Sequence, residues 1–115
     1  VETARVVGCD PSNVLVMSTG VIGQQLPMEK VLKGIHDLKG KLSTDGGANA
    51  ALGIMTTDTK PKKAHASIKT QSGEVRIGGM AKGVGMIHPN MATLICVVTT
   101  DAVFEPEVLK KITKD

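Results

Sequence analysis

The chain has 115 residues, enough for one domain with a modest core and too few for two ordinary domains. Its 14 Lys and Arg residues against 11 Asp and Glu residues give a net charge of +3, with both signs interspersed. This balance favours solubility over an electrostatic partner. Because Phe104 is the only aromatic residue, the short basic cluster KPKK at 60–63 has no stacking platform beside it, which excludes nucleic acid as the main partner.

Cysteine usage and hydropathy exclude two further classes of site. Cys9 and Cys96 lie far apart without a CxxC or Cys/His spacing, so the sequence predicts two buried, reduced thiols and no zinc site. No apolar stretch approaches the roughly 18 residues that cross a bilayer, and no signal peptide opens the chain, so we expect no membrane partner. Since the chain opens on Val1 rather than Met, we expect an excised or processed piece of a longer protein.

Short-range patterns predict the elements of the first half of the chain. The β-branched run at 14–18 follows the turn-forming DPSN and predicts a buried strand. Apolar residues at helical spacing over 28–38, with Pro27 before them and Gly40 after them, predict an amphipathic helix. The small residues at 46–52 predict a second helix that leads into a strand at 54–56.

The second half of the chain reads mainly as strands. AHASIKT at 64–70 and EVRIGGM at 74–80 alternate on either side of QSG and predict a hairpin. TLICVVTT at 93–100 is the most strand-like segment, and a helix is predicted to begin after Phe104. Together these patterns predict an α+β fold in which helices cover one face of a sheet, with no linker between domains.

The usual catalytic and binding motifs are missing from the sequence. The glycine-rich GGMAKGVG at 78–85 lacks both the GK[ST] ending of a P-loop and a dinucleotide fingerprint. His36, His65 and His88 show no i, i+4 metal spacing, so we interpret His36 and His65 as solvent-facing and keep His88 as a candidate for organising the turn before Thr93. No Gly-x-Ser-x-Gly elbow is present, which speaks against a Ser/His/Asp hydrolase.

Thr93 stands where the glycine-rich loop meets the apolar strand. A threonine hydroxyl needs an adjacent base, and an N-terminal threonine supplies its own α-amino group, which titrates near about 7.7–8. Thr93 is internal, so this chemistry requires a cut between Ala92 and Thr93, which the restraint of Pro89 and the small side chain of Ala92 suit. From the residues alone, a threonine that simply begins a strand remains the simpler interpretation.

Three ordered blocks of the chain resemble one enzyme family. GGMAKGVGMIHPNMATL at 78–94 closely resembles the self-cleavage motif of the ornithine acetyltransferase family, the bifunctional glutamate N-acetyltransferase and amino-acid acetyltransferase of arginine biosynthesis. MSTGVIGQQLP at 17–27 and GIMTTDTKPKKA at 53–64 resemble two further blocks. The resemblance implies a layered α-β-β-α fold of the N-terminal-nucleophile type. Residues 1–115 then form one partial domain, in which 1–92 end the α chain and 93–115 begin the β chain.

The resemblance also implies the catalytic residues. Self-cleavage between Ala92 and Thr93 frees Thr93 as the nucleophile, which carries an acetyl group as an ester from N2-acetylornithine to glutamate. The STG block implies an oxyanion hole made by the hydroxyl of Thr19 and the backbone N–H of Gly20; without the family, a tight turn after a strand explains the same residues.

Substrate-binding residues and partners follow from the same resemblance. The TTDT block implies a substrate-contacting threonine, Thr56, with Thr57 and Thr59 open as alternatives. Lys82 is implied to bind the α-carboxylate of the substrate, the alternative being an exposed loop lysine. The family needs no metal and no nucleotide, and its bifunctional members use acetyl-CoA as a co-substrate. The implied macromolecular partner is the rest of the precursor, in a heterotetramer of α and β chains located in the bacterial cytoplasm or in an organelle such as the mitochondrial matrix or chloroplast.

Two other functions stay open. An N-terminal-nucleophile aminopeptidase or amidase would release the acyl group to water, and a non-catalytic interaction domain would keep the motif uncut. Family members continue into a second chain with further substrate-binding residues, of which this sequence holds only 93–115. We therefore expect the 115-residue piece to be inactive alone and to expose apolar surface.

Overall fold

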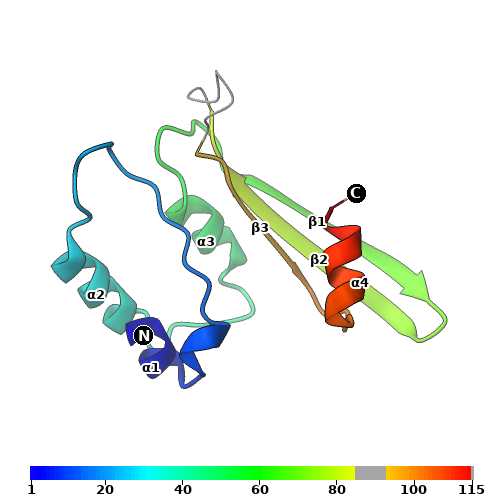
Figure 1. Cartoon of the computed structure of the whole chain (residues 1–115). Helices are drawn as coiled ribbons and strands as arrows, with labels where there is room; N and C mark the ends of the chain where they lie inside the picture. The colour runs from blue at the N-terminus through cyan, green and yellow to red at the C-terminus, as the bar shows by residue number, and fades with distance from the viewer. Residues whose placement is uncertain (85–92, 115) are drawn as a thin grey trace. The chain divides into compact units, whose positions relative to one another are not determined.

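The computed structural model describes residues 1–84 and 93–114 (Figure 1). The chain divides into two compact units, Val1–Ala50 and Ala51–Asp115. Helices occur together with an antiparallel three-stranded sheet, which confirms the predicted α+β class. The layered two-sheet arrangement, the single partial domain and the chain division at residue 92 stay predictions.

The first unit contains helices near the N-terminus and after the first loop: α1 (Glu2–Val7), the 3-10 turn η1 (Pro11–Asn13) and α2 (Met28–Asp37). Helix α2 confirms the predicted amphipathic helix, with Pro27 at its N-cap position and Gly40 beyond its end at a φ of 76°. Helix α1 is not among the predicted elements. It packs against α2, where His36 Nε2 lies 2.8 Å from Glu2 Oε1. The side chain of His36 is 47% exposed, in agreement with the prediction that it faces solvent.

Residues 14–18, predicted as a buried strand, form no strand, so that prediction is wrong. Leu15 and Val16 are 90% and 84% exposed. A strand needs a neighbour for its backbone donors and acceptors, and no segment within the described residues pairs with this one. The apolar run therefore remains a loop.

The second unit is built on a hairpin of the two longest strands, β1 (Lys62–Thr70) and β2 (Gly73–Lys82), with β3 (Ile95–Thr100) on the other side of β2. These three strands confirm the predicted hairpin and the predicted strand at 93–100. Gln71 and Ser72 form the turn, and Gly73 adopts a φ of 130° that side chains rarely allow. The turn chemistry therefore agrees with the strand alternation on either side of it.

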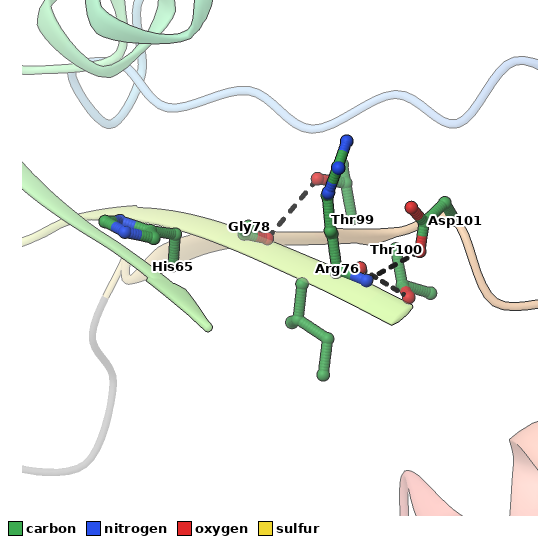
Figure 2. A pocket seen from close by; sticks show the side chains of 7 residues that line it. His65, Arg76, Gly78, Thr99, Thr100 and Asp101 are labelled. Carbon is green, nitrogen blue, oxygen red and sulfur yellow. Dashed lines mark hydrogen bonds between the residues drawn. The ribbon is translucent and has the colours of Figure 1, made fainter. Parts of the chain in front are cut away.

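Hydrogen bonds fasten β3 to β2 beyond their backbone ladder (Figure 2). The hydroxyl of Thr100 donates to Arg76 O at 2.9 Å, and Asp101 Oδ1 accepts from the Arg76 N–H at 2.7 Å. The register pairs Ile77 with Thr100 at this end of the strand pair, and Lys82 with Ile95 at the other end. The register of β3 is therefore fixed, and with it the place where β3 begins.

Short helices flank the sheet in sequence: α3 (Gly47–Gly53) and α4 (Pro106–Ile112). They confirm the predicted helices at 46–52 and after Phe104. The strand predicted at 54–56 is wrong, because local turn bonds replace a ladder there. The N–H of Met55 donates to Leu52 O at 3.2 Å, and the N–H of Thr56 donates to Asp58 Oδ2 at 3.4 Å.

Few of the residues that the structure describes are buried, and half of the buried ones are charged. Among the described residues only Ala4, Ala51, Asp58 and Lys82 are buried. Every residue of β1 is exposed, so the prediction that helices cover one face of the sheet is wrong for this strand. The face of β1 at 64, 66 and 68 carries two alanines, which offer little apolar area for a helix to bury.

The exposure of the two cysteine thiols contradicts the sequence prediction. Cys9 and Cys96 were predicted to be buried, and both are exposed. Cys9 follows Gly8, which ends α1, and Cys96 lies on the edge strand β3, so neither position is enclosed by neighbouring elements. Across residues 1–84 and 93–114, every helix falls short of the length and apolarity that a membrane crossing requires.

Candidate functional site

A buried carboxylate, Asp58, joins three segments at one end of the sheet. Its Oδ1 accepts hydrogen bonds from Lys62 Nζ at 2.5 Å and from the Gly83 N–H at 2.8 Å, and its Oδ2 accepts from the Thr56 N–H at 3.4 Å. The side chain of Asp58 is 1% exposed, whereas that of Lys62 is 46% exposed. Bonding to Lys62 and to the Gly83 N–H lowers the pKa of Asp58 to about 2, so its carboxylate is ionised at neutral pH.

Lys82 is the second buried charged residue and the last residue of β2. It is 5% exposed, so the alternative of an exposed loop lysine is wrong. Within residues 1–84 and 93–114, none of the ion pairs includes Lys82. The backbone at Lys82 is held by pairing with Ile95 on one side and by the bond from Gly83 to Asp58 on the other. A lysine of low solvent exposure on such a fixed backbone is suited to binding a carboxylate with its ammonium.

Thr93 and Thr56 belong to the same end of the sheet. Thr93 is exposed and precedes β3 by two residues, and because Ile95 pairs with Lys82, Thr93 lies just beyond the sheet end that Lys82 occupies. Thr56 is exposed, and its backbone is tied to Asp58. The structure thus brings three predicted residues to one sheet end. Ala92, the other half of the predicted cleavage site, and His88 lie outside the described residues.

The predicted oxyanion-hole residues belong to the first unit, in the loop between η1 and α2. Thr19 is half-buried and Gly20 is exposed. A Cβ atom at Gly20 would lie 3.4 Å from Leu26 Cδ2, an ordinary van der Waals contact, so the local packing does not require glycine there. A role for the Thr19 hydroxyl and the Gly20 N–H beside Thr93 stays a prediction.

A cavity of about 370 Å³ lies on the sheet, and Figure 2 shows the residues that line it. It reaches from His65 on β1 across β2 to Asp101, which follows β3. His65 is exposed, as predicted. Among the described residues, none of the predicted catalytic or substrate-binding side chains lines this cavity, so it is separate from the sheet end that carries Lys82.

Asp58 is the site residue that the sequence patterns did not indicate. The resemblance assigned the TTDT block through its threonines, and the aspartate between them drew no role. Its bond to Gly83 spans 25 residues and depends on the hairpin register, which pairs Lys62 with Ala81. The available signal in the sequence was a charged residue, Asp58, inside a block predicted to bind substrate.

A comparison with known protein families identifies the family of the chain. A sequence model described as the ArgJ family matches residues 1–115. The chain belongs to the ArgJ family. This membership confirms the resemblance found in the three sequence blocks.

Curated ArgJ proteins are similar to almost the whole chain. The protein named "Arginine biosynthesis bifunctional protein ArgJ, mitochondrial" from Heterostelium pallidum is 52% identical over 104 residues, which cover 90% of this chain and 24% of that protein. The "Arginine biosynthesis bifunctional protein ArgJ" of Symbiobacterium thermophilum is 51% identical over 108 residues, covering 94% and 27%. That of Caldanaerobacter subterraneus is 48% identical over 114 residues, covering 99% and 28%. The chain therefore spans about a quarter of the length of these relatives.

Proposed function

We propose that this chain is the part of an ArgJ acetyltransferase that contains the self-cleavage site and the catalytic nucleophile. The complete enzyme transfers an acetyl group from N2-acetylornithine to glutamate in arginine biosynthesis. The match to the ArgJ family over the whole chain carries the proposal. The relatives' name, arginine biosynthesis bifunctional protein, supports the pathway and a second activity, for which we propose acetyl-CoA as the acetyl donor.

The first step is self-cleavage between Ala92 and Thr93. The Thr93 hydroxyl attacks the Ala92 carbonyl carbon; its proton passes to the nitrogen as the C–N bond breaks and an ester forms. Water then hydrolyses the ester, which leaves a carboxylate on Ala92 and both a free hydroxyl and a free α-amino group on Thr93. Residues 1–92 become the end of the α chain, and 93–115 become the start of the β chain.

The second step is acetyl transfer through Thr93. Its α-amino group accepts the hydroxyl proton while the oxygen attacks the acetyl carbonyl of N2-acetylornithine. The tetrahedral intermediate collapses, the proton passes to the departing nitrogen, and ornithine leaves an acetyl ester on Thr93. The glutamate amine attacks this ester, which releases N-acetylglutamate and restores the hydroxyl. The Thr19 hydroxyl and the Gly20 N–H donate to the oxyanion in both halves of the reaction.

Substrate binding uses the end of the sheet. The donor and the acceptor share an α-carboxylate, and the ammonium of Lys82, a residue that is 5% exposed, pairs with it in each half-reaction. Low solvent exposure strengthens such a pair, because water screens it less. The exposed Thr56, tied through its backbone to Asp58, contacts the same substrate. No metal and no nucleotide cofactor takes part.

The active enzyme includes the rest of its precursor. Since the chain spans about a quarter of its relatives, the complete site needs residues from the remaining sequence, and the 115-residue piece is inactive alone. The complete domain is layered as α-β-β-α and assembles as a heterotetramer of α and β chains. It works in the bacterial cytoplasm or in an organelle, and one relative is named mitochondrial.

Isotope-labelled acceptor tests this function. The complete protein is incubated with N2-acetylornithine and 15N-glutamate, and products are identified by mass spectrometry. We expect 15N-labelled N-acetylglutamate and free ornithine. Acetate and ornithine without the labelled product would instead identify an amidase and contradict the transfer. The 115-residue piece, assayed in parallel, is expected to give no product, and measurable transfer by it would overturn its proposed inactivity.

A further inference from the structure

One hydrogen bond connects the buried side chain of Asp58 to the backbone next to Lys82, the other buried charged residue among those described. Asp58 Oδ1 accepts from the N–H of Gly83, the residue that directly follows Lys82. Asp58 also accepts from the Thr56 N–H, so one carboxylate links both of the loops that carry predicted substrate-binding residues. Thr56 and Gly83 are far apart in sequence and have no other bond in common among the described residues.

We propose that Asp58 is a positioning residue, which fastens the loop of Thr56 to Gly83 and so holds the ammonium of Lys82 where the substrate's α-carboxylate binds. The inference rests on the proposed acetyl transfer, because it assigns Asp58 to the binding step of that reaction. Asp58 touches neither substrate nor nucleophile in this account and acts through the backbone on either side of it.

The donor set around Asp58 fits an ionised carboxylate. Three donors converge on it, two backbone N–H groups and the Lys62 ammonium, and an ionised carboxylate only accepts hydrogen bonds. An asparagine keeps one carbonyl oxygen for Gly83 and Lys62 and turns an NH2 group toward the Thr56 N–H. Asp58→Asn therefore retains the bond to Gly83, whereas Asp58→Ala removes every bond.

A second aspartate in the chain serves as a matched control. Lys33 and Asp37 form an ion pair with the same 2.5 Å distance and the same i, i+4 spacing as Asp58 and Lys62. The side chain of Asp37 is 52% exposed, and in the described chain its carboxylate accepts only from Lys33. Asp37→Ala therefore removes a Lys–Asp pair without releasing a loop.

The experiment compares two donors in the complete protein: N2-acetylornithine and its α-carboxamide, which lacks the charge that Lys82 binds. Misplacement of a binding group by about an ångström is expected to cost tenfold or more. We expect Asp58→Ala to lower kcat/KM for the carboxylate donor by about tenfold or more, mainly through KM, with little change for the carboxamide. The ratio of kcat/KM for the carboxylate donor to kcat/KM for the carboxamide donor, the preference, then falls by the same factor. Asp58→Asn should lie between Asp58→Ala and wild type, and Asp37→Ala should match wild type.

Each outcome decides the inference. An unchanged preference in Asp58→Ala, with both donors losing activity equally, would mean that Asp58 only supports the fold and would overturn the proposal. If Asp58→Ala does not fold, Asp58→Leu, which has a similar volume and also lacks an acceptor for the Gly83 N–H, carries the test, and a wild-type preference together with a wild-type KM in that variant overturns the proposal. Failure of the wild-type protein to transfer acetyl would refute the proposed function instead. Hydrogen exchange at the Gly83 amide then tests the hydrogen bond between Asp58 and Gly83. Protection of this amide in wild type that is lost in Asp58→Ala supports the proposal, and an unprotected amide in wild type overturns it.

Discussion

Replacing Lys82 by methionine in the complete protein tests the binding role of the buried ammonium. Methionine has a similar length and no charge, so the variant removes the charge-assisted bond to the substrate and leaves the surrounding packing nearly unchanged. Lys82 is 5% exposed, which limits compensation by water. Because an apolar side chain is usually tolerated where a buried charge stood, the free energy of unfolding should not fall.

The expected loss follows from the type of bond. A hydrogen bond to a charged group contributes about 1.5–3 kcal/mol, and each 1.4 kcal/mol is a factor of ten. Lys82→Met should therefore raise KM for N2-acetylornithine by about 10- to 140-fold, with a smaller effect on kcat.

Initial rates of acetyl transfer measure this effect, with Lys63→Met as the control. Lys63 is the second residue of the neighbouring strand β1, pairs with Met80 in the register, and is exposed. Its replacement should leave KM unchanged. Equal KM values for the two variants, or a loss confined to stability, would refute the assignment of Lys82 to the substrate's α-carboxylate.

Three further predictions concern stability and exposure. The pKa of Asp58 lies at about 2, below the usual 3.8, so its contribution to stability is complete above about pH 4 and is lost as the pH falls through 2. The difference in unfolding midpoint between wild type and Asp58→Asn should therefore narrow as the pH falls from about 4 to about 2. A difference that stays constant would contradict a stabilising role of the ionised Asp58 carboxylate. Gly73→Ala should destabilise the protein by about 1–3 kcal/mol because of its φ of 130°. Gly79→Ala, whose Cβ would meet only Val97 O at 3.8 Å, should be neutral or stabilise the protein by up to about 1 kcal/mol, because alanine loses less backbone entropy than glycine in a strand; equal melting shifts for the two variants would contradict this reasoning. Cys9 and Cys96 in the 115-residue chain should both react with a maleimide without denaturant, and a protected thiol would contradict their exposure.

The helices and strands that were predicted correctly have sequence patterns that lie within the element itself. Helix α2 has apolar residues at helical spacing between Pro27 and Gly40, and the hairpin has two alternating runs around a short turn. The run at 14–18 failed because a β-branched apolar stretch predicts a strand only if another segment pairs with it. The stretch at 54–56 failed because a turn bond and the side chain of Asp58 satisfied its backbone first.

Some residues of the candidate site could likewise be predicted from the sequence, and others could not. The resemblance indicated Thr56, Lys82 and Thr93, and the hairpin register explains why they share one end of the sheet. Local sequence patterns could not predict the burial of Lys82 or the hydrogen bond between Asp58 and the Gly83 N–H, because burial depends on the folded sheet end and the bonded residues lie 25 positions apart. No local pattern reports such a contact.

The most direct test of the account is the state of the bond between Ala92 and Thr93 in the complete protein. Intact mass and N-terminal sequencing are measured for wild type and for Thr93→Ala. We expect two chains from wild type, one beginning Thr-Leu-Ile-Cys, and a single uncut chain from the variant. If wild type also remains a single chain, Thr93 is not a self-processing nucleophile, and the acetyl-threonine mechanism is contradicted.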